Sequence, residues 1–282
     1  MNTQLPTPWG GRPLPLLSRA VAALLLAAGS TGSAPAETVD SEIVLLVDIT
    51  RPGLSNREFD GLMDSYANAF TSTEVLDSIQ SGAYGRIAVS MLFYGNTSTQ
   101  SVGIPWMMIG SRTEAEAFAT LARNLSRPFT ISTADLAAGL QAATASFGTE
   151  TGGSSNGFES TMQVIEVASG KRQPLRTASD VAASSAGALG SGVDLINALA
   201  LGNQANAIDS FYTDNVIGSG IEGVTASSTP VSNTGAFTAA VAGMVSSTVT
   251  TGATQSLNAV PEPTALVGLL PASLLLWRRR RG

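Results

Sequence analysis

EIVLLVD, residues Glu42–Asp48, is a continuous apolar run between two acidic residues, and it decides the fold. A strand with one face in water alternates apolar and polar residues, whereas a strand buried on both faces is apolar throughout. Strands of the second kind occur in parallel sheets whose two faces are covered by helices. The run therefore predicts a central strand of a mainly parallel sheet, with Asp48 at its carboxyl end.

The segments that follow this strand alternate between helix and strand. Ser55-Asn56-Arg57-Glu58 is a capping box, which predicts a helix with apolar residues at helical spacing behind it. Arg86–Tyr94 predicts a second buried strand, and Ser101–Trp106 predicts an antiparallel edge strand that stops near Pro105. This alternation predicts a Rossmann-like α/β sandwich with right-handed crossovers and helices on both faces. Further helices are predicted over residues 111–125 (with Leu121 inward), 133–147, 179–189 and 237–249, strands over 161–168 and 193–201, a terminal element over 210–217, and loops or linkers over 227–235 and 250–260.

Residues 1–36 have the features of a signal peptide. Two arginines precede the apolar segment Ala20–Ala28, which is too short to span a bilayer. Ala34 and Ala36 form the A-x-A pattern that signal peptidase cleaves, because its pocket accepts only small side chains. We therefore expect an exported protein whose mature chain begins near Glu37.

The carboxyl-terminal residues 260–282 contain three consecutive features. Val260-Pro261-Glu262-Pro263 is followed by an apolar segment over 265–277 and then by Arg278-Arg279-Arg280-Arg281. The arginines are expected to stay cytoplasmic by the positive-inside rule, so the segment would anchor the precursor transiently in the inner membrane. This order resembles the PEP-CTERM sorting signal of biofilm-forming or exopolysaccharide-producing Gram-negative bacteria. The resemblance implies that a membrane exosortase removes the tail and that the protein reaches the outer surface or extracellular matrix; an ordinary membrane anchor is the alternative.

Composition limits what the remaining chain can do. Residues 37–260 contain nine basic and twenty acidic residues, a net charge of −11, which argues against nucleic acid and anionic membranes as partners. The chain has neither cysteine nor histidine, so it lacks disulfides, Ser-His-Asp and Cys-His catalysis, and histidine-based zinc sites. We expect one domain over residues 37–250, a linker over 251–259, and no enzymatic activity.

Three motifs indicate a more specific relationship. They are Arg86-Ile87-Ala88-Val89, Pro105-Trp106, and the stretch DSFYTDNVIG over residues 209–218. Together with the strand that ends at Asp48, they resemble a bacterial family of secreted von Willebrand factor A-type domains. The resemblance covers approximately residues 40–250 and implies the A-type sandwich, with a mainly parallel sheet and one antiparallel edge strand.

The same resemblance implies a metal-ion-dependent adhesion site for Mg²⁺ or Mn²⁺. Asp48 and Thr50 match the first two ligand positions at the carboxyl edge of the sheet, and Thr133 matches the second-loop threonine. Two departures weaken the pattern. Pro52 stands where a serine is expected, with Ser55 as a possible substitute, and no aspartate follows the third strand, where Lys171 would add positive charge.

Each of these residues also has a structural explanation. Asp48 and Thr50 are typical of a turn at a strand end, and Thr133, or Ser132 beside it, is typical of a helix N-cap. Arg176, with the nearby Lys171-Arg172 pair, forms a basic spot that suits either an anionic polysaccharide or a solvated loop.

The function predicted from these features is an extracellular binding or adhesion module with a degenerate metal site. Its partners during export would be signal peptidase and exosortase, and its ligand an extracellular polysaccharide or protein. A metal-free structural protein of the matrix is the first alternative. A hydrolase of envelope polymers is the second, and it would need paired carboxylates in a cleft.

Overall fold

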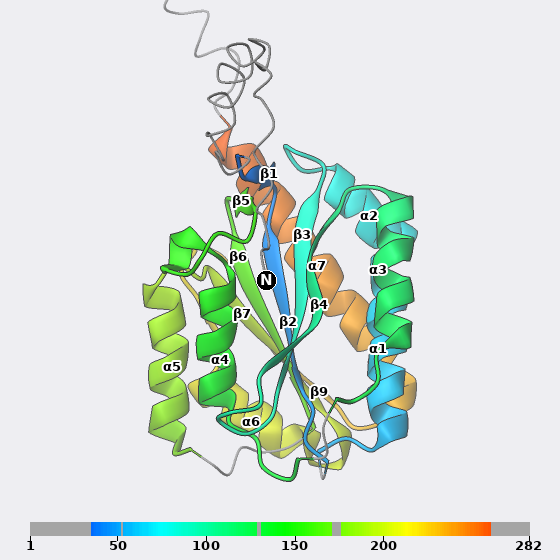
Figure 1. Cartoon of the computed structure of the whole chain (residues 1–282), viewed down its shortest axis with the longest axis vertical. Helices are drawn as coiled ribbons and strands as arrows, with labels where there is room; N and C mark the ends of the chain where they lie inside the picture. Colours follow the sequence, from blue (N-terminus) through cyan, green and yellow to red (C-terminus); the bar gives the residue numbers. More distant parts are fainter. Residues whose placement is uncertain (1–34, 52, 129–130, 171–175, 261–282) are drawn as a thin grey trace, which may run out of the picture. The chain divides into compact units, whose positions relative to one another are not determined.

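A computed structural model of the chain describes residues 35–51, 53–128, 131–170 and 176–260 (Figure 1). Several predicted features lie outside these residues, namely Ala34, Pro52, Lys171-Arg172, Pro261-Glu262-Pro263 and Arg278–Arg281. In the described part, no helix combines the length and the apolar character that crossing a membrane requires.

The predicted central strand is the middle of a seven-stranded sheet. Strand β2 (Glu42–Asp48) is buried along its whole length and pairs in parallel with β3 (Ile87–Tyr94) and β6 (Gln163–Ser169). The sheet order is β4-β3-β2-β6-β7-β8, with β9 also paired to β7. Strands β4 (Ser101–Ile109) and β8 (Gly218–Ser219) run antiparallel to their neighbours β3 and β7. Strand β7 (Leu195–Leu201) runs parallel to β6, and β9 (Ser228–Val231) runs parallel to β7. Strands β1 (Glu37–Val39) and β5 (Phe158–Ser160) form a separate parallel pair.

Helices cover both faces of this sheet, as the sequence predicts (Figure 1). One face carries α1 (Asn56–Phe70), α2 (Thr73–Gln80), α3 (Arg112–Asn124) and α7 (Phe237–Ala259). The other face carries α4 (Leu136–Ser146), α5 (Ala178–Gly190) and α6 (Ala205–Asn215). The strands therefore contribute alternate side chains to two apolar cores, one on each side of the sheet. The fold is the predicted α/β sandwich of the von Willebrand factor A type.

The capping box predicted at the start of α1 is present. The Ser55 hydroxyl accepts a hydrogen bond from the Glu58 backbone N–H at 3.2 Å, and the Glu58 carboxylate accepts one from the Ser55 backbone N–H at 2.8 Å. The predicted apolar face is buried, including Phe59, Tyr66 and Phe70. Each such side chain contributes about 1.5–3 kcal/mol by leaving water. The capping box thus sets where this helix begins, and burial of its apolar face stabilises it against the sheet.

Strand β4 differs from its prediction. It continues past Pro105 to Ile109, because its pairing with β3 shifts register twice, between Val89 and Met91 and between Met91 and Leu92. A register shift of this kind leaves a residue without a ladder bond, and proline, which has no N–H, is tolerated there. The expectation that the strand stops near Pro105 is therefore wrong.

Two further predictions, one of a linker and one of a helix face, are also wrong. Residues 250–260 were predicted as linker from their Ser, Thr and Gly content, but α7 continues to Ala259. Tertiary contacts explain the difference: Gly252 packs against Ser41, and the Ser256 hydroxyl accepts a hydrogen bond from the Ala83 N–H at 3.1 Å. In α3, Leu121 was predicted to face inward, but its side chain is 46% exposed.

A carboxyl group lies inside the core beneath α1 and α7. Glu166 on β6 is completely buried, and neither of its oxygens accepts a well-formed hydrogen bond among the described residues. Its Cα neighbours across the sheet are Leu45 and Asn197. Burial raises the pKa of Glu166 to about 7, and the Thr248 hydroxyl lowers that pKa only in part. Such a group makes the free energy of unfolding depend on pH.

Candidate functional site

Asp48 lies at the carboxyl edge of the sheet, where the predicted metal site would be. Its Oδ1 accepts a hydrogen bond from the Thr50 backbone N–H at 2.8 Å, and its Oδ2 accepts one from the Ser169 hydroxyl at 2.6 Å. Ser169 ends β6, the strand beside β2. Burial raises the pKa of Asp48, and the bonds from Ser169 and Thr50 oppose that effect in part. Each carboxylate oxygen thus accepts one hydrogen bond from the protein itself.

Thr50 lies beside Asp48, and the predicted second loop runs next to it. Thr50 forms a parallel β-bridge with Ile131, and the Arg51 N–H donates to the Ile131 carbonyl at 2.7 Å. The Thr50 hydroxyl is buried without a hydrogen-bond partner in the described segments. Thr133 follows two residues after Ile131 and is half-buried, but among the described residues no hydrogen bond joins it to Asp48 or Thr50. The structure therefore unites two of the three predicted ligands.

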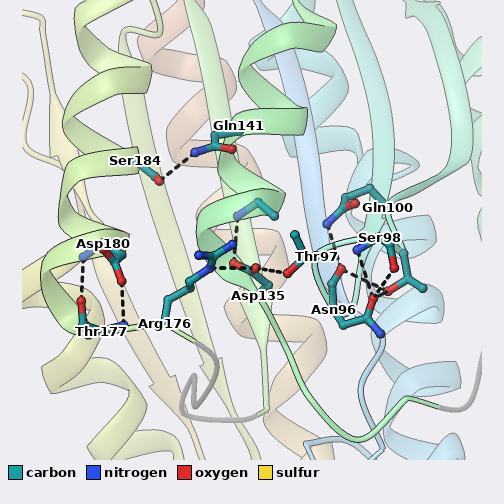
Figure 2. Close-up of polar contacts among 12 residues, drawn as sticks. Asn96, Thr97, Ser98, Gln100, Asp135, Gln141, Arg176, Thr177, Asp180 and Ser184 are labelled. Atoms are coloured by element: carbon teal, nitrogen blue, oxygen red, sulfur yellow. Dashed lines mark hydrogen bonds and ion pairs between the residues drawn. The ribbon is translucent and has the colours of Figure 1, made fainter.

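The N-cap of α4 is Asp135, so the prediction of Thr133 or Ser132 as its N-cap is wrong. Figure 2 shows Asp135 between Thr97 and Arg176. Asp135 Oδ1 accepts the Ala138 N–H at 3.1 Å, and Oδ2 accepts the Thr97 hydroxyl at 2.6 Å and Arg176 Nε at 3.0 Å. Burial acts to raise the pKa of Asp135, but these three bonds outweigh it and lower that pKa. Aspartate is a strong N-cap residue, so the sequence did hold this signal, two positions later.

Arg176 was predicted as part of a basic spot, and the structure gives it a partner. Its guanidinium forms an ion pair with the buried Asp135, while its own side chain remains 44% exposed. The pair joins Arg176, just before α5, to the start of α4 (Figure 2). A hollow lined by residues of α4 and α5 lies beside it. An ion pair with one buried member and two further hydrogen bonds on the carboxylate is mainly structural.

Arg127, which the sequence did not single out, holds the loop between β2 and α1. Its guanidinium lies 4.9 Å from the centre of the Phe59 ring. It also donates four hydrogen bonds to carbonyl oxygens of the loop, at 2.8 Å to Ile49, 3.0 Å to Thr50, 2.8 Å to Leu54 and 3.1 Å to Ser55. A positive charge is therefore fixed close to Asp48. No local pattern marks such a residue, because the carbonyls that it bonds lie more than 70 positions earlier in the chain.

These residues do not fit a resident divalent cation. Mg²⁺ and Mn²⁺ need several oxygen ligands, of which carboxylates supply most of the compensating charge. The described residues contain no group of three or more acidic side chains that could hold a metal ion. Asp48 is engaged by Ser169 and Thr50, and the Arg127 guanidinium offsets its charge. The uncompensated Thr50 hydroxyl is one neutral ligand, which is too little to balance a divalent charge in a buried site.

We therefore expect that divalent cations do not stabilise the fold. Thermal unfolding of the full chain in EDTA and in millimolar MgCl₂ or MnCl₂ should give the same midpoint within error, in the wild type and in Asp48→Asn. A ligand at about 100 times its dissociation constant adds about 2.7 kcal/mol, which shifts the midpoint by a few degrees. A rise of that size that Asp48→Asn removes would show that the site binds the cation.

A polar hollow of about 610 Å³ opens at the same edge of the sheet. It lies between the β2–α1 loop and the residues that follow β7 and β9, and its lining includes Arg51, Leu54, Asn56, Glu58, Asn203 and Ser232. Arg51 is exposed and donates to the Asn56 side-chain oxygen at 3.1 Å. Glu58 is occupied by the capping box. Arg51 and Glu58 are thus the two charged side chains in the lining, and Arg51 lies near the positive end of α1 with its guanidinium exposed.

Comparisons with solved structures identify the fold. Proximal thread matrix protein 1 from the mussel byssus and a von Willebrand factor type A structure from Catenulispora acidiphila each give a TM-score of 0.50 at 10% identity over 75% of this chain. The pilus adhesin SpaC from Lactobacillus rhamnosus GG gives 0.50 at 12% identity over 76% of it. The matches cover 48%, 43% and 30% of those structures respectively, so the chain spans less than half of each.

Comparison of the sequence with protein families gives one match. A family model described as "Protein of unknown function (DUF1194)" matches residues 38–247, which is most of the chain. No curated protein matches it.

Proposed function

The chain belongs to the DUF1194 family of proteins of unknown function, and from that membership and its A-type fold we propose that it is an exported binding or adhesion module. It would act at the cell surface or in the extracellular matrix, on a polysaccharide or protein ligand. Two proteins of the same fold, by their descriptions, are a thread matrix protein and a pilus adhesin. The fold alone does not assign a function, so the proposal also needs support from the site.

The observation that carries this proposal is the hollow beside Arg51. In open α/β sheets, ligands bind beyond the carboxyl ends of the strands, and the hollow lies there. An exposed arginine at a helix N-terminus suits an acidic or hydroxyl-rich group on a partner. Catalysis is not part of the proposal, because the chain lacks histidine and cysteine and the carboxylate of Asp48 is buried and hydrogen-bonded.

Arg51 should therefore matter for attachment to the matrix. Labelled full-length protein is mixed with extracellular matrix from cells that lack the gene, and the fraction that sediments is measured. We expect Arg51→Glu to weaken binding about tenfold, since it replaces a charge-assisted contact by repulsion. Arg57→Glu is the matched control, because Arg57 is exposed on the first turn of α1 but does not line the hollow.

The alternative function, a structural matrix protein without a discrete ligand, predicts a different result. Its support is that the Asp48 carboxylate already accepts hydrogen bonds from Ser169 and Thr50 of the protein itself. Under this alternative, Arg51→Glu and Arg57→Glu would reduce sedimentation equally, through net charge alone. Equal effects of the two substitutions would remove the hollow from the proposal.

Export forms the other half of the proposal, and it has its own test. We expect the protein recovered from cells to have lost residues 1–36 by cleavage after Ala36, and to have lost the tail beyond the motif that begins at Val260. Intact mass spectrometry of that protein measures both ends. A mass that still includes Arg278–Arg281 would contradict sorting by exosortase and favour an ordinary anchor.

A further inference from the structure

A second hollow, of about 510 Å³, lies beside Trp106 at the other end of α4. It is bordered by the edge strand β4 on one side and by the end of α4 and the loop after it on the other. Its lining includes Val102, Pro105, Trp106, Ser146, Ser154 and Ser155. Asp135 and the carboxyl edge of the sheet lie at the opposite end of α4 (Figure 1). This hollow is therefore separate from the one beside Arg51.

The hollow lies where the pairing of β3 and β4 shifts register. Ser90 lies where the β3–β4 pairing slips, and its hydroxyl donates to the Ile104 carbonyl at 3.0 Å, replacing a ladder bond. Irregularities of this kind bend the strand and redirect its side chains. On the far side, the loop is packed so closely that a Cβ on Gly153 would run into the Ala145 carbonyl oxygen. Both walls are thus held by backbone geometry.

Trp106 is fixed in one orientation. Its indole Nε1–H donates to the Ser146 carbonyl at 2.8 Å, and its ring lies 5.7 Å from Phe147 and 6.5 Å from Phe158 in tilted contacts. The side chain is still half-buried rather than enclosed, and it lines the hollow. A rigid aromatic surface that is partly open to solvent costs little conformational entropy when a ligand stacks on it.

The rest of the lining is uncharged, and it combines apolar side chains such as Leu92, Val102 and Pro105 with a few polar ones. No described residue that lines the hollow has a charged side chain. Ser154 is exposed and its hydroxyl makes no hydrogen bond within the described part of the chain, while Ser155 accepts a bond from the Gly157 N–H at 3.3 Å and keeps its own proton to donate. The combination is an aromatic plane with hydroxyl groups at its rim and no ion.

We propose that the hollow beside Trp106 binds a neutral sugar residue of a polysaccharide. The apolar C–H face of a pyranose ring would stack on the indole, and its hydroxyl groups would bond to Ser154 and Ser155. An ionic ligand would lose its water without gaining a counter-charge here. An apolar ligand would make no use of the two exposed serine hydroxyls, with which sugar hydroxyls can form hydrogen bonds. The volume is within the range of pockets that hold small ligands.

The test is isothermal titration calorimetry on the full chain, in a polyoxyethylene detergent so that the detergent carries no sugar. The probes are cellobiose, maltose and N,N′-diacetylchitobiose, with digalacturonic acid as the charged probe and a proline-rich peptide as the protein probe. We expect saturable binding of at least one neutral disaccharide and at least about tenfold weaker binding in Trp106→Ala. Binding of none of the neutral sugars, or of the charged sugar or the peptide in their place, would overturn the proposal.

A second variant guards against misfolding, because Trp106 also packs on Phe147. Ser154→Trp should fill the hollow from its exposed rim without removing any buried contact, and it should abolish sugar binding while the melting temperature stays constant. Ser247→Trp is the matched control, since Ser247 is exposed on α7, on the other face of the sheet. Undiminished sugar binding in Ser154→Trp would also overturn the proposal. The result does not depend on the Arg51 hollow, so either proposal can fail alone.

Discussion

Replacing Arg127 by alanine is expected to lower the free energy of unfolding by about 3–5 kcal/mol, the largest loss that we predict for a residue outside the apolar core. The substitution removes four hydrogen bonds from one guanidinium to the loop between β2 and α1. It leaves the buried carbonyls of Ile49 and Thr50 without these donors. It also removes the positive charge that favours the ionised form of Asp48. Urea unfolding of the full chain measures the change.

Two controls separate this role from a general effect of charge. Arg127→Lys should recover only part of the loss of stability. An ammonium group keeps the positive charge but lacks the planar, forked guanidinium that reaches all four carbonyls. Arg123→Ala should cost less than about 1 kcal/mol, since Arg123 is exposed and lies 3.9 Å from the exposed Asp64. If Arg127→Ala costs no more than Arg123→Ala, the loop is held by other contacts.

The second large effect is a loss of stability as pH rises, caused by Glu166. Its pKa in the folded protein is about 7, above the value of 4.5 for a carboxyl in water. Between these values the folded state binds more protons than the unfolded state, so the free energy of unfolding falls as pH rises from about 4.5 to about 7. The contribution is fully present below pH 4.5 and is lost above pH 7, and it amounts to about 3 kcal/mol.

Glu166→Gln isolates this contribution, because a glutamine carries no charge at any pH. We expect the variant to be more stable than the wild type at pH 8, and to lose less stability between pH 4.5 and 8, by about 3 kcal/mol. The free energy of unfolding of the variant will still fall with pH, because burial also raises the pKa of Glu42 to about 7. The hydrogen bonds of Glu42 with Asn156 and Ser160 oppose that rise in part. Identical pH profiles for the variant and the wild type would show that Glu166 is not buried as described.

Features that depend on neighbouring residues could be predicted from the sequence. The apolar run of β2, the capping box at Ser55 and the edge position of β4 all follow from local patterns and were found where expected. The eight-residue helix α2 was not predicted, because it is short and its apolar residues are few. The helical form of residues 250–259 was missed for a different reason: contacts with Ser41 and Ala83 override their weak helix propensity.

The candidate site was less predictable than the fold. Asp48 and Thr50 could be placed at the edge of the sheet because they end a recognisable strand. Ser169, Arg127 and Asp135 decide what that edge can bind, and they act through partners distant in sequence. A sequence pattern records residue types, but not which carboxylate is already satisfied. That information comes only from the packed structure.

The end of the described chain is held by helix α7. The helix ends at Ala259, and Val260, the first residue of the proposed sorting motif, caps it through a bond from its N–H to the Ser256 carbonyl. The first residue of that motif is thus part of the folded domain. A force applied at Val260 would be transmitted directly into a 23-residue helix that packs along α1 and α2, so the domain would resist being unfolded from this end.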